Sequence, residues 1–462
     1  MLFNSLPFLY FFLPVTYFIF WRLRSRSSRY VWLTLTGYVF YSFWDYRFCA
    51  LMALSTVISY VAGLAMLRWP TGTARKLCLW VPIALDLSLL GFFKYADFTL
   101  SSMRGVAGWL GYGLNVPSLA IILPVGISFY TFHTITYIVD SYRGVITPTR
   151  NLFEFSAYVS LFAQLVAGPI VRFRQIEADL DNVDEAAQRR DLETAWSFFA
   201  IGLFKKVLIA DSIAAVIDPA LVTPASLSTL DAWLAAIGYT YQLYFDFSGY
   251  SDMAVGLGLM LGLRLPQNFN SPYKAEGPSD FWRRWHISLS TVLRDYLYIP
   301  LGGSRKGVVR TYANLITTML LGGLWHGASW TFVAWGGYHG GLLALERAFG
   351  DSWTRLPRRL RQATTFVLVL AGWVLFRSSS FGSAQDWLSR MFVPHFGARV
   401  LTSLMLPVSL GIAAIAAHLL PNTFEIRHRW NGAMVTGFVV LLILVVVRLY
   451  SGQASPFLYF QF

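Results

Sequence analysis

Long apolar runs recur along the whole chain, and short stretches rich in arginine or lysine separate them. The first run, SLPFLYFFLPVTYFIFW at residues 5–21, leads directly into a cluster of four arginines at 22, 24, 26 and 29. A helix needs about 20 apolar residues to cross the hydrocarbon core of a bilayer. Because lipid cannot hydrogen-bond to the backbone, such runs fold as helices that satisfy their own peptide groups. The pattern predicts an all-α protein that crosses a membrane many times.

The composition agrees with this class. A chain of 462 residues that is 56% hydrophobic and only 13% charged is too apolar for an ordinary soluble domain. A net charge of +13 would suit a nucleic-acid partner. However, the basic residues lie between apolar runs, which is the positive-inside pattern of membrane proteins. We attribute the charge to topology and to anionic lipid or ligand, and expect no nucleic-acid partner.

The basic clusters predict which loops face the cytosol. No basic residue precedes the first run and a cluster follows it, the reverse of a cleaved signal peptide. We therefore expect a multi-pass protein whose N-terminus and C-terminus both lie outside. About eleven helices should be embedded in the membrane, within a single domain over 1–462. The expected cytosolic loops are 22–29, 68–76, 283–310, 355–361 and 427–429.

Some segments depart from a simple membrane span. Residues 153–171 are broken by Gly168 and Pro169, which predicts a short or re-entrant helix buried in protein. Residues 97–117 are expected at the outer surface, and 172–193 as a cytosolic amphipathic helix or loop. Cys49 and Cys78 lack a metal-ligand spacing and are interpreted as core residues.

Several polar residues fall inside apolar runs. Asp86 is costly at membrane depth and should face the bundle interior. Asp246 and Asp252 lie six positions apart in YFDFSGYSDMA. They suit acid–base work or a cation site, or alternatively cap a helix that is kinked at Gly249. His133 is interpreted mainly as a packing residue.

The stretch Phe281–Gly341 combines two unusual features. FWRRWHISLSTVLRDYLYIPLGGSRKG is basic and aromatic, and the apolar run NLITTMLLGGLWHGASWTFVAWGGYHGG follows it closely. His286 and His326 are forty positions apart (326 − 286), and each directly follows a tryptophan. The first part is too charged to span and should lie in the cytosolic interface. A plain positive-inside loop would also explain its charge.

Basic residues of this kind would form a binding surface for a phosphate-rich thioester, such as a coenzyme A or phosphopantetheine thioester. We therefore expect the donor to contact this segment and the tryptophan before His326. The candidate binding residues are Arg283, Arg284, Trp285, Arg294, Arg305, Lys306 and Trp325.

His326 is the strongest catalytic candidate, with His286 as the second. An imidazole with an ordinary pKa near 6.5 can act as a base at neutral pH. In acyl transfer it would take the proton from an acceptor hydroxyl that attacks a thioester carbonyl. The alternative is a buried histidine that donates to a carbonyl. A metal site of His286, His326 and His339 is not expected, because on one helix the last two would point about 220° apart.

Several long motifs together resemble the membrane-bound O-acyltransferase (MBOAT) family. They are FWRRWHISLSTVLRDYLYIPLGG, MLLGGLWHGASW, YFDFSGYSDMA, ISFYTFHTITYIVDSYRG and the closing FLYFQF. The resemblance covers nearly the whole chain. It is to the branch that contains the alginate O-acetyltransferase membrane subunit and the teichoic-acid D-alanyl transfer protein.

The resemblance implies a fold and an activity. His326 matches the family's essential histidine, and His286 matches its second recurrent polar position. Re-entrant and interfacial helices would surround a central passage in a bacterial inner-membrane protein. An acetyl group would pass from a cytosolic donor such as acetyl-CoA to an exported polysaccharide such as alginate or cellulose. The implied partner is a periplasmic SGNH-hydrolase-like acetyltransferase subunit, with no permanently bound cofactor.

Two other functions remain open on the residues alone. A proton- or ion-coupled transporter would use Asp86, Asp246, Asp252 and the histidines as a relay, although no paired halves with matching broken helices are evident. A non-catalytic membrane subunit of a polysaccharide export complex would leave the histidines dispensable.

Overall fold

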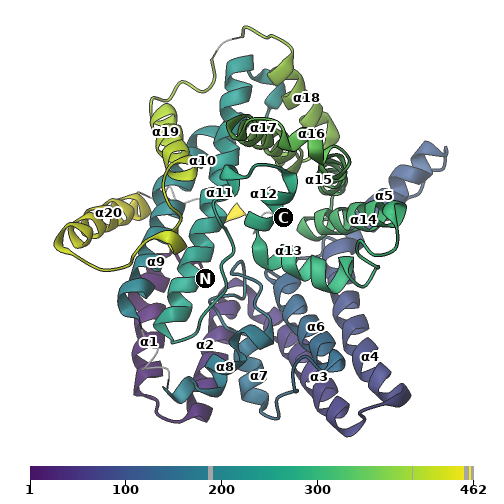
Figure 1. Ribbon diagram of the computed structural model, residues 1–462, viewed down its shortest axis with the longest axis vertical. Coiled ribbons are helices and arrows are strands. Elements are labelled where there is room, and N and C mark those ends of the chain that lie inside the picture. Colours follow the sequence, from purple (N-terminus) through teal and green to yellow (C-terminus); the bar gives the residue numbers. More distant parts are fainter. Residues whose placement is uncertain (186–190, 398, 452–456, 459–462) are drawn as a thin grey trace. The chain divides into compact units, whose positions relative to one another are not determined.

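Helices form every regular element in the part of the chain that the structure describes, which confirms the all-α prediction (Figure 1). The structure is a computed structural model, and it describes residues 1–185, 191–397, 399–451 and 457–458. The chain packs as two units, Met1–Leu192 with Leu257–Pro266, and Glu193–Gly256 with Gln267–Phe462. The single domain expected over 1–462 stays a prediction.

The first unit contains the N-terminal apolar runs as helices. Ser25 begins one of them as an N-cap, accepting a hydrogen bond from the Ser28 N–H. A π turn at Phe8–Phe12, a 3₁₀ turn at Tyr46–Phe48 and a π turn at Gly91–Tyr95 extend the helices. The helices are α1 (Leu13–Arg22), α2 (Arg26–Asp45), α3 (Cys49–Arg68), α4 (Gly72–Leu90), α5 (Ala96–Trp109), α6 (Ile127–Arg143), α7 (Leu152–Val159) and α8 (Phe173–Asp181). Thus most of the expected surface segment 97–117 is in fact helical.

The broken segment behaves as its glycine and proline predict. Helix α7 ends at Val159, and residues 160–172 continue as buried, non-helical chain. At Gly168 a Cβ would lie 2.5 Å from the Ala163 carbonyl oxygen, so only glycine fits there. The irregular backbone is buried in protein, as expected for such a segment in a membrane protein.

Asp86 on α4 faces the interior of the first unit. Its side chain accepts hydrogen bonds of 2.6 Å from the hydroxyl groups of Ser55 and Thr134. Asp86 is only 2% exposed. The prediction that this carboxyl group faces the bundle is confirmed.

The second unit carries the remaining helices, except that Leu192 and Leu257–Met260, at the ends of two of them, belong to the first unit. Short π turns at Lys205–Ala210 and Arg294–Tyr298, and 3₁₀ turns at Pro224–Ser226, Pro272–Lys274 and Thr423–Glu425, join or extend them. The helices are α9 (Leu192–Phe204), α10 (Asp211–Ala220), α11 (Thr229–Met260), α12 (Pro278–Arg284), α13 (Ile287–Leu293), α14 (Val308–His326), α15 (Trp330–Ala348), α16 (Gly350–Thr354), α17 (Arg358–Arg377), α18 (Phe381–Phe392), α19 (Met405–His418) and α20 (Gly432–Tyr450).

Helices α14 and α15 form a tight pair, visible side by side in Figure 1. Helix α14 ends at His326, Gly327 is extended, and the Ser329 side chain caps α15. A Cβ at Gly323 would lie 2.2 Å from the Phe332 carbonyl oxygen, and one at Gly336 would lie 2.3 Å from that of Met319. Glycine therefore brings the two backbones into contact. His326 and His339 stand on different helices, so the single-helix angle between them does not apply.

Four helical stretches among the described residues are long and apolar enough to cross a membrane. They are Arg26–Arg68, Gly72–Trp109, Arg358–Arg377 and Gly432–Tyr450. Two shorter apolar helices, Phe8–Arg22 and Met405–His418, accompany them. The expected number of about eleven embedded helices stays a prediction.

Candidate active site

His326 is the last residue of α14 and is 5% exposed. Its ring packs between aromatic side chains from two other helices. Trp335 of α15 lies 5.1 Å away and Phe376 of α17 lies 5.4 Å away, measured between ring centroids. The helix end and its aromatic neighbours together fix the position of the imidazole.

His286 lies beside His326, with 6.4 Å between the two ring centroids. The residue occupies the break between α12 and α13, where its backbone is left-handed with φ of 43°. The side chain is fully buried against Phe247, at a centroid distance of 4.7 Å. Forty positions of sequence therefore separate two rings that the fold brings together.

Asn268 holds His286 in place, although no sequence pattern singles it out. Its Oδ1 atom accepts hydrogen bonds from the Ser288 backbone N–H, at 3.3 Å, and the Ser288 hydroxyl, at 2.9 Å. The same oxygen lies 3.1 Å from His286 Nδ1. An amide oxygen can only accept, so Nδ1 carries the proton and Nε2 of the neutral ring is the basic nitrogen.

A cavity of about 650 Å³ opens beside His326, and we call it the histidine cavity. Its walls come from α12, α13, the following π turn, α14 and α15, and most of them are apolar. Gly322 lines it one turn before His326; a Cβ there would lie 3.1 Å from the Leu293 side chain. The polar side chains on the walls are Ser279, Arg283, Ser290, Thr291, Arg294, Tyr298, Thr318 and His326.

Two of the predicted donor-binding residues, Arg283 and Arg294, line the histidine cavity. The Arg283 side chain is 71% exposed and lies 3.5 Å from Asp280. Arg294 pairs with Asp295 at 2.7 Å and is 60% exposed. Both guanidinium groups therefore stand at the rim, where a charged ligand can reach them.

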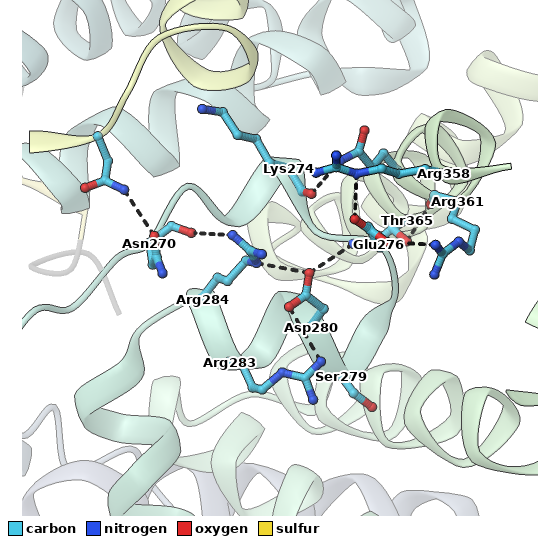
Figure 2. Close-up of polar contacts among 12 residues, drawn as sticks. Asn270, Lys274, Glu276, Ser279, Asp280, Arg283, Arg284, Arg358, Arg361 and Thr365 are labelled. Atoms are coloured by element: carbon cyan, nitrogen blue, oxygen red, sulfur yellow. Dashed lines mark hydrogen bonds and ion pairs between the residues drawn. The ribbon is translucent and has the colours of Figure 1, made fainter. Parts of the chain in front are cut away.

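Arg284 and Trp285 have structural contacts. Arg284 bonds to Asp280 at 3.0 Å and to the Asn270 carbonyl oxygen at 3.3 Å (Figure 2). Trp285 is 1% exposed and packs on Phe281 and Trp373. Neither is among the described residues that line the histidine cavity.

The other three predicted binding residues also lie off the cavity wall. Arg305 and Lys306 are exposed in the loop that follows Gly302 and Gly303, both of which have positive φ. Trp325 is buried next to His326, and its ring is 6.2 Å from that of His286. The loop thus precedes the first residue of α14, whereas the tryptophan lies in its last turn.

His339 lies close to the histidine pair because α15 is a separate helix. Its ring is 5.0 Å from Trp335, the same tryptophan that packs on His326. It also packs on Trp282 at 5.2 Å and is 1% exposed. A tryptophan thus stands between His326 and His339.

Asp246 and Asp252 on α11 are paired with lysines and are not among the described residues that line the histidine cavity. Lys206 Nζ is 2.6 Å from Asp246 and 2.7 Å from Asp211. Asp246 also accepts a 3.0 Å hydrogen bond from the backbone N–H of Leu458 near the C-terminus. Lys205 Nζ lies 2.6 Å from Asp252, whose carboxylate accepts a hydrogen bond from Thr423. Of the remaining candidates, His133 belongs to the first unit, where it packs on Tyr158.

The fold and the site define a helical membrane protein with two adjacent buried histidines, one of which, His326, lines an apolar cavity. The chain belongs to the membrane-bound O-acyltransferase (MBOAT) family, whose sequence signature matches residues 113–385. That range contains both histidines and all the described residues that line the histidine cavity. The protein is therefore a multi-pass membrane O-acyltransferase, as the motifs predict.

Relatives of the chain carry several acyl-transfer names. The probable alginate O-acetylase AlgI of Pseudomonas putida is 41% identical, and the alignment covers 100% of both chains. The peptidoglycan O-acetyltransferase of Helicobacter pylori is 37% identical over 85% of this chain and 80% of its own length. The teichoic acid D-alanyltransferase of Streptococcus thermophilus is 29% identical over 52% of this chain and 59% of its own.

Proposed function

We propose that the protein transfers an acetyl group from a cytosolic thioester, such as acetyl-CoA, for the O-acetylation of an exported polysaccharide such as alginate or cellulose. The observation that carries the proposal is the histidine pair, whose rings are 6.4 Å apart and of which His326 lines a cavity of about 650 Å³. Full-length relatives named as alginate O-acetylases support acetate as the acyl group and a polysaccharide as its acceptor.

His326 acts as the general base. It takes the proton from the acceptor hydroxyl as that oxygen forms a bond to the thioester carbonyl carbon. The carbon–sulfur bond then breaks, and the imidazolium returns the proton to the leaving thiolate. His286 is the second acid–base group, because Asn268 keeps its Nδ1 protonated and its Nε2 basic. An apolar cavity favours this chemistry, since low polarity strengthens each interaction with the developing charge.

The donor enters along the basic segment. Arg283 and Arg294 at the cavity rim bind its phosphates, and Arg305 and Lys306 on the adjoining loop provide a first electrostatic contact. Arginine suits this role because its planar guanidinium group can bond two phosphate oxygens at once. The donor is a substrate rather than a resident cofactor.

The remaining assignments follow from topology and from the resemblance. The basic loops lie in the cytosol and both termini outside, in a bacterial inner membrane. A periplasmic SGNH-hydrolase-like subunit completes the transfer onto sugar hydroxyls. Membrane lipid surrounds the exposed apolar helices such as α20.

Acetyl transfer by the purified protein tests the role of His326. With radiolabelled acetyl-CoA and the soluble partner, His326→Ala should lower the transfer rate by at least about 100-fold, the usual contribution of a general base. His395→Ala is the matched control, because only backbone atoms of His395 bond to Thr229. Transfer at the full rate by His326→Ala would refute the assignment.

Deletion of the gene identifies the acceptor polysaccharide. Acetyl esters should disappear from one exported polymer and return when the intact chain is supplied, but not when His326→Ala is supplied. Unchanged acetylation of every exported polysaccharide would contradict the proposed acceptor class.

A further inference from the structure

A second cavity of about 640 Å³ lies in the same unit, and we call it the basic cavity. The 3₁₀ turn Pro272–Lys274, the first turns of α17 and the C-terminal end of α19 form its walls. It shares none of its lining residues with the histidine cavity. The side chains that matter here are Lys274, Arg358, Arg359, Phe366, His418 and Leu419.

Positive charge dominates the mouth of this cavity. Lys274 Nζ donates to the Leu420 carbonyl oxygen at 2.6 Å, a neutral partner that leaves its charge uncompensated. Arg359 is exposed and has no ion pair among the described residues. Arg358 shares the carboxylate of Glu276 with Arg361, at 2.7 and 2.8 Å. Figure 2 shows Glu276 held by both arginines. Three cations, Lys274, Arg358 and Arg359, thus line the cavity, and no acidic residue is among its described lining residues.

The backbone of α17 also favours an anion at the mouth of the basic cavity. Arg358 and Arg359 are the first two residues of α17, a helix of 20 residues. The unbonded N–H groups and the positive end of the helix dipole therefore lie at the same place as the arginine side chains. An anion bound there would be favoured by the side chains and by the backbone together.

The inner wall of the basic cavity is aromatic and apolar. Phe366 packs edge-on against His418, with 5.1 Å between ring centroids. The Tyr241 hydroxyl, 3.1 Å from His418 Nε2, holds that ring in place. Leu419 completes this side. The cavity thus pairs a cationic mouth with an apolar interior, which matches a ligand that joins an anionic group to an apolar or aromatic part.

We propose that the basic cavity binds a phosphate group whose parent molecule carries an apolar or aromatic part. A nucleotide 3′-phosphate and the headgroup of an anionic phospholipid share this chemistry. Phosphate fits better than carboxylate, because its tetrahedral oxygens point in different directions and can engage Lys274, Arg359 and the α17 N-terminus at once, in a monoester and in a diester alike. Coenzyme A carries a nucleotide 3′-phosphate, so the nucleotide source rests on the proposed function, whereas the lipid source does not; a binding measurement tests both without turnover.

Binding to the full-length protein in nanodiscs tests the proposal. One arm measures the binding of adenosine 3′,5′-bisphosphate by calorimetry to protein in phosphatidylcholine discs. The other measures retention of phosphatidylglycerol by native mass spectrometry after extraction from discs of mixed composition. Arg359→Glu should weaken binding in one arm by at least about tenfold, which is the contribution of one charge-assisted hydrogen bond. The arm that responds identifies the source of the phosphate.

The matched control is Arg355→Glu, an exposed arginine three residues before α17 that does not line the basic cavity. Lys274→Gln is a second variant and should weaken the same arm. Unchanged binding by Arg359→Glu in both arms, or an equal loss in Arg355→Glu, would overturn the proposal. Thermal unfolding of each variant distinguishes lost binding from lost fold.

Discussion

Two sets of buried polar groups in the second unit differ in the partners that surround them. Lys206 stands between Asp246 and Asp211, and Lys205 meets Asp252, so each charge has a direct opposite partner. His286 and His326 instead lie among aromatic rings, and His326 borders a cavity. The lysine and aspartate groups link α11 to neighbouring segments, including Leu458, whereas His326 borders space that a substrate can fill.

The comparison shows that charge inside a membrane protein is a poor guide to its reactive centre. Asp246 and Asp252 are the more conspicuous residues in the sequence, and a transporter would use them as a relay. Their lysine partners give them a structural explanation. A titratable group that borders a cavity is the stronger functional signal, because it can reach a ligand.

Removing Lys206 should produce the largest effect on stability. Lys206→Met leaves Asp246 and Asp211 without their shared cation in a site that is 2% exposed. Breaking a buried ion pair in this way costs about 3–5 kcal/mol. Thermal unfolding in detergent should show a much lower midpoint, and the residual folded fraction should retain acetyl transfer.

Lys205→Met is the matched comparison. The Lys205 side chain is 15% exposed and has one carboxylate partner, so its loss should cost clearly less. Equal destabilisation by the two substitutions would mean that burial of the Lys206 cluster adds nothing. A folded Lys206→Met protein that has lost acetyl transfer would indicate that this cluster takes part in the reaction.

The second prediction concerns the histidine pair, in which Asn268 positions His286. Asn268→Ala removes the oxygen that fixes the His286 ring, and kcat should fall about 10- to 100-fold, the usual cost of losing such a positioning contact. KM should change little, because Asn268 is not among the described residues that line the histidine cavity. Steady-state kinetics with acetyl-CoA measure both constants.

Asn268→Asp retains an acceptor oxygen at the same place and should recover much of the lost kcat. If the two variants lose equal activity, the hydrogen bond to His286 does not position the ring. A parallel loss of thermal stability in Asn268→Ala alone would indicate a general packing role.

Arg283→Gln should have the smallest effect. The side chain is 71% exposed, so solvent screens its interaction with the donor phosphate. Its acidic neighbour Asp280 keeps a second arginine, Arg284. We expect KM for acetyl-CoA to rise about two- to fivefold with kcat unchanged, and the difference to shrink at high salt. Arg355→Gln should leave KM unaltered, and a fall in kcat in Arg283→Gln would contradict a purely electrostatic role.

Much of the fold follows from local pattern. Apolar length marked the helices, and Gly168 with Pro169 marked the buried break after α7. Helix α18 was not expected, because its apolar residues are too few for a span. Ala384, Trp387 and Met391 are nevertheless buried at helical spacing, and Ser380 caps the first turn. An amphipathic pattern of this kind could have revealed it.

The histidine pair was predicted as one site, yet the surrounding contacts were not. Asn268 and His286 are 18 positions apart, and no periodicity connects them. The break at Gly327 was also hidden, because glycine in an apolar run serves equally well inside a closely packed helix. Contacts between distant segments depend on tertiary packing, which single-sequence patterns do not encode.

The left-handed backbone at His286 has a consequence for how this protein can change over evolution. A residue with a Cβ atom at φ of 43° costs about 1–2 kcal/mol compared with right-handed backbone, whereas glycine has no such penalty. Glycine would remove this backbone cost, but it would also leave the space beside Phe247 empty and Asn268 without one of its partners. The left-handed backbone therefore narrows the residues that can replace His286 to those that both tolerate positive φ and fill the buried space, of which asparagine and aspartate are the usual non-glycine alternatives.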